Sequence, residues 1–443
     1  MKKIRIGSGA GYGGDRLEPA LTLIENAKLD YIGFECLAER TIALAQKEKR
    51  LNPDKGYNHL LEYRMEKVLP LAHKHNVKVI TNMGAANPIA AMFLIAEMAE
   101  KQGLKGIKIA AVLGDDVLEL IDDKKQYQIL ETGKPLSSIE NSIVSANAYL
   151  GVSGIVEALN NDADIIVTGR VADPALFLAP MIYEFCWDMT DFDKLGKGTL
   201  IGHLLECAAQ VSGGYFADPG KKDVENLWDV GFPFVEIDET GEGYISKVDG
   251  TGGIINTATC TEQLLYEIHD PANYLTPDCV ADFSKVEFDL VEKDKVKFSH
   301  ASGKTATDSY KVSVGYQNGY FGLGEISYGG ANCMERAKLA GDIIQKRLEK
   351  YTFSDLRIDF IGLNSISPLN YEVNEIPEIR LRVSGKAASL ETAKQVGREV
   401  EALYTNGPAG GGGATQKTEE VISVASIFLK KSEVQTTIIY KAI

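Results

Sequence analysis

The first half of the chain alternates short apolar runs with segments of helical periodicity. Each run passes directly into a polar loop, and the runs centre on Ile4, Tyr31, Val79, Ile109 and Ile165. Such alternation is typical of βαβ units, whose strands lie side by side in a parallel sheet. We therefore predict an α/β fold, a parallel sheet with helices of the doubly wound or Rossmann-like kind.

The pattern changes near residue 270. Beyond it, residues 310–316 alternate in polarity and lead into a hairpin turn signal at residues 317–319, and single helical segments replace the βαβ units. We predict a parallel α/β domain over residues 1–270, which carries the site, and an α+β domain with a mostly antiparallel sheet over residues 271–443. Within the first domain, residues 138–160 have the periodicity of one long helix.

The chain is acidic, with a net charge of −15, and this balance argues against nucleic acid and anionic membranes as partners. The most apolar helical segment, residues 89–99, is too short to span a bilayer, and the first residues lack the apolar core of a signal peptide. Six cysteines are scattered without a CxxC pair, which argues against disulfides and structural zinc. We expect a cytoplasmic homo-oligomer.

The carboxyl ends of parallel strands meet at one edge of a sheet, where ligands bind. The loop after the first run contains Gly9, Gly11, Asp15 and Arg16, and we expect these residues to bind the substrate. Backbone N–H groups of such a loop can bind a phosphate or a carboxylate. The spacing is not that of a dinucleotide fingerprint, and a tight strand-to-helix turn is the structural alternative.

Glu35, Cys36 and Glu39 follow the second run. The two glutamates are four residues apart, so they share a face if a helix begins there. Paired carboxylates can divide into an acid and a base, or hold a divalent cation. A salt bridge to Arg40 is the structural alternative for the glutamates, and burial is the alternative to a nucleophilic role for Cys36.

Arg170 and Asp173 follow the fifth run. An arginine at the end of an apolar strand can bind a carboxylate or phosphate bidentately, with the aspartate orienting it. A purely structural Arg–Asp pair is the alternative. His203 stands three residues before Glu206, a helical spacing that suits a metal ligand pair or an acid/base pair, although a packed helix histidine also fits.

Four polar residues mark the remaining strand ends. Asn82 and Asn87 can orient a carbonyl or carboxylate of the substrate, and the neighbours Asp115 and Asp116 can hold a divalent metal. Asparagine and aspartate are also ordinary helix N-caps at these junctions.

Nine segments, taken together and in order, resemble the acyclic terpene utilisation (AtuA-type) family. They are GSGAGYGGDRLEPA, FECLAERTIALAQ, TNMGAANP, TGRVADP, GHLLEC, GGYFADPG, EQLLYEIHDPANYLTPD, GEISY and YTNGPAGGGG. The family is named for bacterial gene clusters that degrade citronellol and geraniol through acyl-CoA intermediates. Many members carry an additional C-terminal module or are encoded beside it, so the resemblance implies a small protein subunit as a partner.

We predict a catabolic enzyme that acts on a carboxylic acid or its CoA thioester by lyase or hydratase chemistry, because the chain has no redox motif and no G-x-S-x-G. Arg170 and Arg16 would bind the acid, and Glu35 or Glu39 would act as base. The cofactor stays unnamed, apart from a metal at Asp115 or His203 and a CoA moiety as part of the substrate. Two alternatives stay open. One is a non-catalytic scaffold subunit that uses its glycine run at residues 407–414, and the other is a hydrolase dependent on Cys36.

Overall fold

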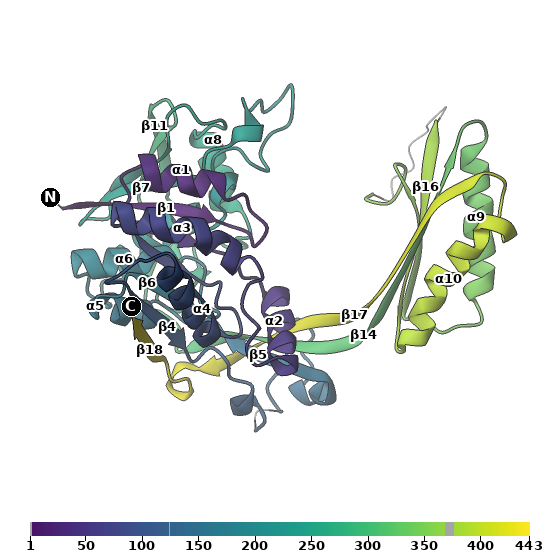
Figure 1. Cartoon of the computed structure of the whole chain (residues 1–443), viewed down its shortest axis with the longest axis horizontal. Helices are drawn as coiled ribbons and strands as arrows, with labels where there is room; N and C mark the ends of the chain where they lie inside the picture. The colour runs from purple at the N-terminus through teal and green to yellow at the C-terminus, as the bar shows by residue number, and fades with distance from the viewer. Residues whose placement is uncertain (1, 124, 368–375) are drawn as a thin grey trace. The chain divides into compact units, whose positions relative to one another are not determined.

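A ten-stranded mixed sheet organises the first part of this computed structural model, which describes residues 2–123, 125–367 and 376–443 (Figure 1). Five consecutive strands of the sheet are parallel. In spatial order they are β1 (Lys3–Ala10), β2 (Tyr31–Phe34), β3 (Lys78–Thr81), β6 (Ile165–Thr168) and β4 (Lys108–Leu113). They are the five apolar runs, so the prediction of parallel pairing among them is confirmed.

Antiparallel strands extend this sheet at both ends. Beyond β1 lie β7 (Pro233–Asp238), β8 (Gly243–Lys247), β12 (Lys295–Ser299) and β11 (Glu287–Glu292), and beyond β4 lies β18 (Thr437–Ala442). The expectation of a purely parallel layer is therefore wrong, because later strands pair with both free edges. The order β1-β2-β3-β6-β4 also differs from the order 3-2-1-4-5-6 of the dinucleotide-binding fold, so a Rossmann-like fold is not confirmed.

Helices cover both faces of the parallel strands. Ile32 packs in one core with α1 (Glu18–Asn26), α3 (Leu61–His75) and α4 (Pro88–Lys101). The next residue, Gly33, faces Phe177 on the other side, as the alternation of a strand requires. That side carries α5 (Ser153–Asn160), α6 (Ala175–Phe185) and α7 (Phe192–Glu206).

Residues 138–160, expected as one helix, form a strand and a short helix. β5 (Ile143–Ala148) pairs with the start of β14 (Ser309–Gly329), and α5 begins only at Ser153. Just after β5, the Tyr149 N–H donates to the Lys311 carbonyl at 2.9 Å. The helical periodicity was misleading because a distant strand supplies backbone partners, and this pairing outweighs local propensity.

Smaller elements complete this part of the chain. They are α2 (Glu39–Leu51), α8 (Thr257–Leu265), the small sheet of β9 (Tyr274–Leu275), β10 (Val280–Asp282) and β13 (Ser302–Lys304), and 3-10 turns at Glu119–Ile121, Leu136–Ser138, Glu140–Ser142, Ala208–Gln210, Leu227–Asp229 and Lys431–Glu433. The small sheet packs on α7. No helix within the described ranges is both long and apolar enough to cross a membrane.

The chain separates into two compact units. Unit 1 comprises Met1–Gly315 and Val424–Ile443, and unit 2 comprises Tyr316–Ser423. The division falls after residue 315 instead of near 270, because the hairpin β11–β12 continues the large sheet and β10 and β13 pack on α7. The last strand, β18, also returns to the large sheet.

Unit 2 has the order of a split βαβ fold. Its elements are β14, α9 (Cys333–Leu348), β15 (Asp355–Ile361), β16 (Glu378–Ala387), α10 (Leu390–Asn406) and β17 (Gly411–Lys430), with strand order β15-β16-β14-β17. The glycine run at residues 407–414 forms the turn after α10 and the start of β17, where Arg336 donates to the Ala409 carbonyl at 2.6 Å.

Candidate functional site

The loops that follow β1, β2 and β6 border one cavity of about 520 Å³ in unit 1. The acidic side chains of its wall are Asp15, Glu35, Glu39, Asp173, Glu206 and Glu267, and the basic one is Arg170. Tyrosines 12, 215 and 266 also line it. Three of the five predicted strand ends therefore supply one site, and its described wall is predominantly acidic.

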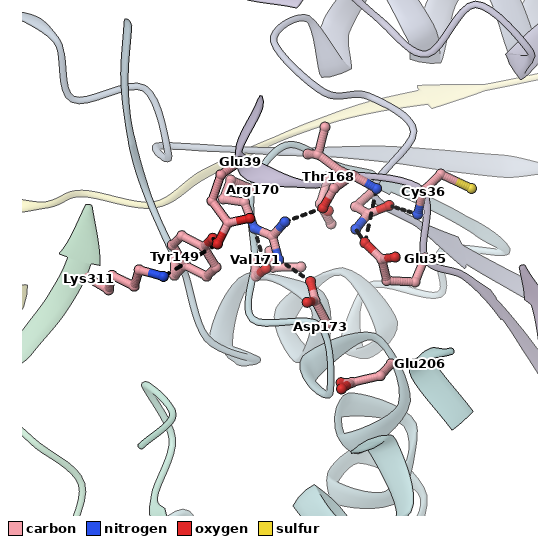
Figure 2. Close-up of polar contacts among 12 residues, drawn as sticks. Glu35, Cys36, Glu39, Tyr149, Thr168, Arg170, Val171, Asp173, Glu206 and Lys311 are labelled. Carbon is pink, nitrogen blue, oxygen red and sulfur yellow. Dashed lines mark hydrogen bonds and ion pairs between the residues drawn. The ribbon is translucent and has the colours of Figure 1, made fainter. Parts of the chain in front are cut away.

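Glu35 is held rigidly at the end of β2. Its Oε1 accepts hydrogen bonds from the Leu37 N–H at 2.9 Å and from Asn82 Nδ2 at 2.8 Å (Figure 2). Burial raises the pKa of Glu35 well above its usual value, the nearby Asp173 charge adds to the rise, and Arg170 opposes it. Burial therefore favours the protonated form of Glu35, which is the form that a general acid needs.

Arg170 is 1% exposed and donates three side-chain hydrogen bonds within the protein. Its Nε donates to the Val171 carbonyl at 2.9 Å, Nη1 donates to the Leu37 carbonyl, and Nη2 donates to Asp173 (Figure 2). The guanidinium also stacks over the ring of Tyr149. Its geometry matches the structural alternative, an internal counter-ion, rather than a free clamp for an acidic ligand.

Asp173 borders two cavities, the acidic one and a neighbouring cavity of about 400 Å³. The exposed 37% of its side-chain surface borders these spaces. Burial raises the pKa of Asp173 to about 7, with Glu206 and Glu39 adding to the rise and Arg170 opposing it. A carboxyl group with this pKa can both accept and donate a proton at neutral pH.

Glu39 has the opposite protonation behaviour. Burial alone would raise its pKa, but the Tyr149 hydroxyl, which donates to Glu39 at 2.5 Å, and the charges of Arg170 and Lys311 lower that pKa to about 2 (Figure 2). Lys311 Nζ lies 3.3 Å from the same carboxylate. The pKa values of two glutamates four residues apart are therefore shifted in opposite directions within one site.

His203 lies behind the cavity wall rather than in it. Its Nδ1 is 2.7 Å from Glu206 Oε1, its Nε2 is 3.2 Å from the Leu264 carbonyl, and the ring is 1% exposed. Burial alone would lower the pKa of His203, but Glu206 and the carbonyl raise it overall. The residue predicted as catalytic is thus the counter-ion of Glu206, which does line the cavity.

The glycine loop after β1 contributes only part of its sequence to the cavity. Gly11 and Asp15 line it, and Asp15 Oδ2 accepts a hydrogen bond from the Gly11 N–H at 2.8 Å. Gly9 packs against an aromatic ring of β2, and Arg16 is exposed and donates to the Trp228 carbonyl at 2.6 Å. Gly9 and Arg16 are therefore absent from the described wall of this cavity.

Asn82 and Asn87 stabilise loops behind the cavity. Asn82 is fully buried, and its Oδ1 accepts from the Cys36 N–H at 2.7 Å while its amide holds Glu35. Asn87 caps α4 by accepting from the Ala90 N–H at 3.3 Å, and its amide donates to the Pro53 carbonyl. Neither belongs to the cavity lining, so the geometry favours the structural alternative for both.

Asp115 and Asp116 connect the end of β4 to neighbouring segments. Asp115 Oδ2 accepts from the Arg170 N–H and from Asn147 Nδ2, each at 2.9 Å, and burial raises the pKa of Asp115 to about 6. Asp116 Oδ2 accepts from Gln46 at 3.0 Å. Across the described residues, no group of three or more His, Cys, Asp or Glu side chains is arranged to hold a metal ion.

Cys36 is buried, and Arg64 Nη1 lies 3.1 Å from its sulfur. Burial raises the pKa of the thiol, although Arg64 opposes the rise. A thiol nucleophile needs the opposite, a lowered pKa and access to the substrate. The geometry therefore argues against the Cys36-dependent hydrolase.

One part of the cavity wall does not follow the ends of strands, and the sequence analysis did not predict it. This part comes from the segments after α7 and α8 and comprises Cys207, Ala209, Gln210, Gly214, Tyr215, Tyr266 and Glu267. These residues follow helices, so the rule about strand ends could not find them. The signal was present in GHLLEC, GGYFADPG and EQLLYEIHDPANYLTPD, three of the segments that carry the family resemblance.

Comparison with protein families gives one match that spans nearly the whole chain. The family model described as acyclic terpene utilisation family protein AtuA matches residues 4–440. No curated protein and no solved structure matches the chain. Because the match includes the loops that build the cavity and both compact units, this chain belongs to the acyclic terpene utilisation (AtuA) family.

Proposed function

We propose that this protein is a catabolic enzyme that adds water to, or removes it from, a carboxylic acid derivative. The observation that carries the proposal is a cavity whose carboxyl groups have pKa values shifted in opposite directions. Burial raises the pKa of Glu35 and raises that of Asp173 to about 7, while Tyr149 and the nearby positive charges lower the pKa of Glu39 to about 2. Such separation of pKa values assigns an acid and a base to neighbouring carboxyl groups.

In the dehydration direction, Asp173 takes a proton from the carbon next to the one that bears the hydroxyl. The electrons of that C–H bond form the C=C bond, the C–O bond breaks, and the Glu35 proton leaves with the hydroxyl as water. Glu35 then carries the negative charge and Asp173 the proton, and the reverse reaction restores both. Arg170 stabilises the negative charge that forms on Glu35, Glu39 favours the protonated form of Asp173, and neither residue exchanges a proton. This assignment replaces the prediction that Glu35 or Glu39 acts as the base.

The acidic wall favours a CoA thioester over a free acid. Arg170 is engaged by Asp173, Leu37 and Val171, so it offers little to a free carboxylate. A carboxylate placed among Glu39, Asp173 and Glu206 would be repelled, whereas a thioester carbonyl carries no charge. The phosphates of the CoA moiety would then lie outside this cavity.

The test is water exchange on a panel of acyl-CoA thioesters. The purified protein is incubated with 3-hydroxyacyl-CoA and 2-enoyl-CoA esters in ¹⁸O-labelled water, and isotope uptake is followed by mass spectrometry. Glu35→Gln and Asp173→Asn should each lower the rate by about 10²- to 10⁴-fold. Glu236→Gln, which breaks an ion pair with Arg5 at the far end of β1, should leave it unchanged. Turnover that survives both cavity substitutions would refute the assignment.

The alternative, a binding subunit that needs a small partner protein, keeps one supporting observation. β17, which begins in the glycine run, is the terminal strand of its sheet order, and an edge strand can pair with a strand of another chain. The catalytic proposal is preferred because none of the cavity-lining residues belongs to that run. Turnover by the isolated chain would separate the two.

A further inference from the structure

One carboxylate oxygen in the cavity wall lacks a partner. Glu206 Oε2 is buried and accepts no hydrogen bond within the described part of the chain, and only 10% of the Glu206 side chain is exposed. Its other oxygen, Oε1, is held by His203 at 2.7 Å. Buried polar atoms without a partner are uncommon and costly in native proteins, so this one indicates a group that arrives with the ligand.

His203 contacts Glu206 on the side away from the cavity. Both ring nitrogens of His203 face oxygen atoms, Glu206 Oε1 and the Leu264 carbonyl, an arrangement that favours a proton on each nitrogen. Phe283 and Tyr274 pack against the same ring and shield the pair from water. Because His203 already pairs with Glu206, we expect Oε2 to accept a hydrogen bond from a neutral donor rather than to bind a second cation.

Glu206 faces the acid and the base of the proposed reaction. Its charge acts on Asp173 and on the Cys207 thiol. Glu35 lines the same cavity as these three residues, and Figure 2 shows Glu35, Asp173 and Glu206. A ligand group that reaches Glu206 Oε2 is therefore within the same space as Glu35 and Asp173.

We propose that Glu206 Oε2 binds a hydroxyl group of the substrate, and that this is the hydroxyl that leaves as water. The inference rests on the proposed function and assigns its substrate class, a hydroxylated acyl compound. The hydroxyl donates its hydrogen to Glu206 while its oxygen receives the proton of Glu35. Glu206 thus orients the leaving group and takes no proton itself.

Three probes test this without knowledge of the natural substrate: the neutral 3-hydroxybutyramide and butyramide, and 3-aminobutyramide, whose amine is a cation at neutral pH. They differ in one group and avoid repulsion by the acidic wall, and their binding to the full-length protein is measured by ligand-observed NMR. We expect 3-hydroxybutyramide to bind at least five-fold more tightly than butyramide. Glu206→Gln should remove that preference and Glu236→Gln should preserve it, with circular dichroism confirming that both variants fold.

Equal binding of the alcohol and butyramide would overturn the proposal, and so would tighter binding of the amine or no binding by any probe. Each of these results comes from the wild-type protein and does not depend on whether a variant folds. Two further outcomes distinguish a failure of the hydroxyl site from a failure of the proposed reaction. If the alcohol binds through Glu206 but no thioester exchanges oxygen with water, the reaction is wrong and the hydroxyl site stands. If exchange occurs and Glu206→Gln leaves kcat/KM unchanged, the hydroxyl site is wrong and the reaction stands.

Discussion

The guanidinium carbon of Arg170 lies 4.3 Å from the ring centroid of Tyr149. This stacking, together with three hydrogen bonds, places a permanent positive charge among Glu35, Glu39 and Asp173. Arg170 therefore opposes the effect of burial and lowers the pKa values of these carboxyl groups from inside the protein. The consequences of removing it, or of removing the groups it balances, are measurable.

Arg170→Ala should lower the free energy of unfolding by about 3–5 kcal/mol, because it leaves buried carboxylates without their counter-ion. Arg170→Lys should recover only part of this loss, since lysine lacks the planar fork. Urea denaturation provides the measurement. Arg347→Ala, which removes the exposed partner of Glu399, is the control and should cost much less. A fully stable Arg170→Ala protein that no longer binds an acidic ligand would restore the clamp hypothesis.

Tyr149→Phe should destabilise the protein by about 1 kcal/mol at neutral pH, since it removes a hydrogen bond to an ionised carboxylate. The loss of stability is small because 41% of the Glu39 side chain is exposed, and solvent screens its interactions. The pKa of Glu39 is lowered to about 2 in the folded state, so this stabilisation is present above about pH 4.3, the pKa of a free glutamate, and is lost as the pH falls towards 2. The wild-type advantage in urea should therefore shrink below about pH 4.3. An advantage that grows in acid would contradict the assignment.

Glu35→Gln should become more stable than the wild type as the pH rises. Folding raises the pKa of Glu35, so the folded state holds a proton that the unfolded chain releases, and wild-type stability falls as the pH rises from about 4.3 towards the folded pKa. Melting temperatures from mildly acidic to mildly alkaline pH would show the growing gap. Glu236 is the opposite case. Burial alone would raise its pKa, but hydrogen bonds from Lys3 and Arg5 lower the pKa overall. Glu236→Gln should therefore be less stable than the wild type at neutral pH.

Gly11→Ala should disturb the cavity and lower stability. A Cβ at Gly11 would lie 2.3 Å from the carbonyl carbon of Cys207 and 2.5 Å from the Glu206 carbonyl oxygen, so one loop must move. Overpacking of this kind typically costs about 1–3 kcal/mol. Gly412→Ala is the matched control, because nothing lies within 4 Å of a Cβ there. Equal melting temperatures for the two variants would show that the loop yields freely.

Alkylation should distinguish the cysteines. Cys186 is exposed and Cys36 is buried with a raised pKa, so iodoacetamide at neutral pH should modify Cys186 in the native protein well before Cys36. Peptide mass spectrometry reports the order. Rapid labelling of Cys36 in the folded protein would revive the hydrolase, and so would loss of turnover in Cys36→Ala.

The local signals in the sequence were sufficient for the parallel strands. Ile4, Tyr31, Val79, Ile109 and Ile165 lie in short apolar runs bounded by loops, and a run that is buried on both faces has few other solutions. The same local signals were insufficient for residues 143–148, where the periodicity indicated a helix but the chain forms β5. Pairing with a strand more than 150 residues away is invisible in a local window.

The sequence by itself determined which residue types meet at the strand ends, because parallel strands must deliver their loops to one edge. Glu35, Glu39, Arg170 and Asp173 were identified in this way. Only the tertiary structure decided the direction in which their pKa values shift. It buried Glu35, set Tyr149 and Lys311 against Glu39, and placed His203 behind Glu206. Protonation depends on burial and on charges from other elements, and these become defined only when the chain has folded.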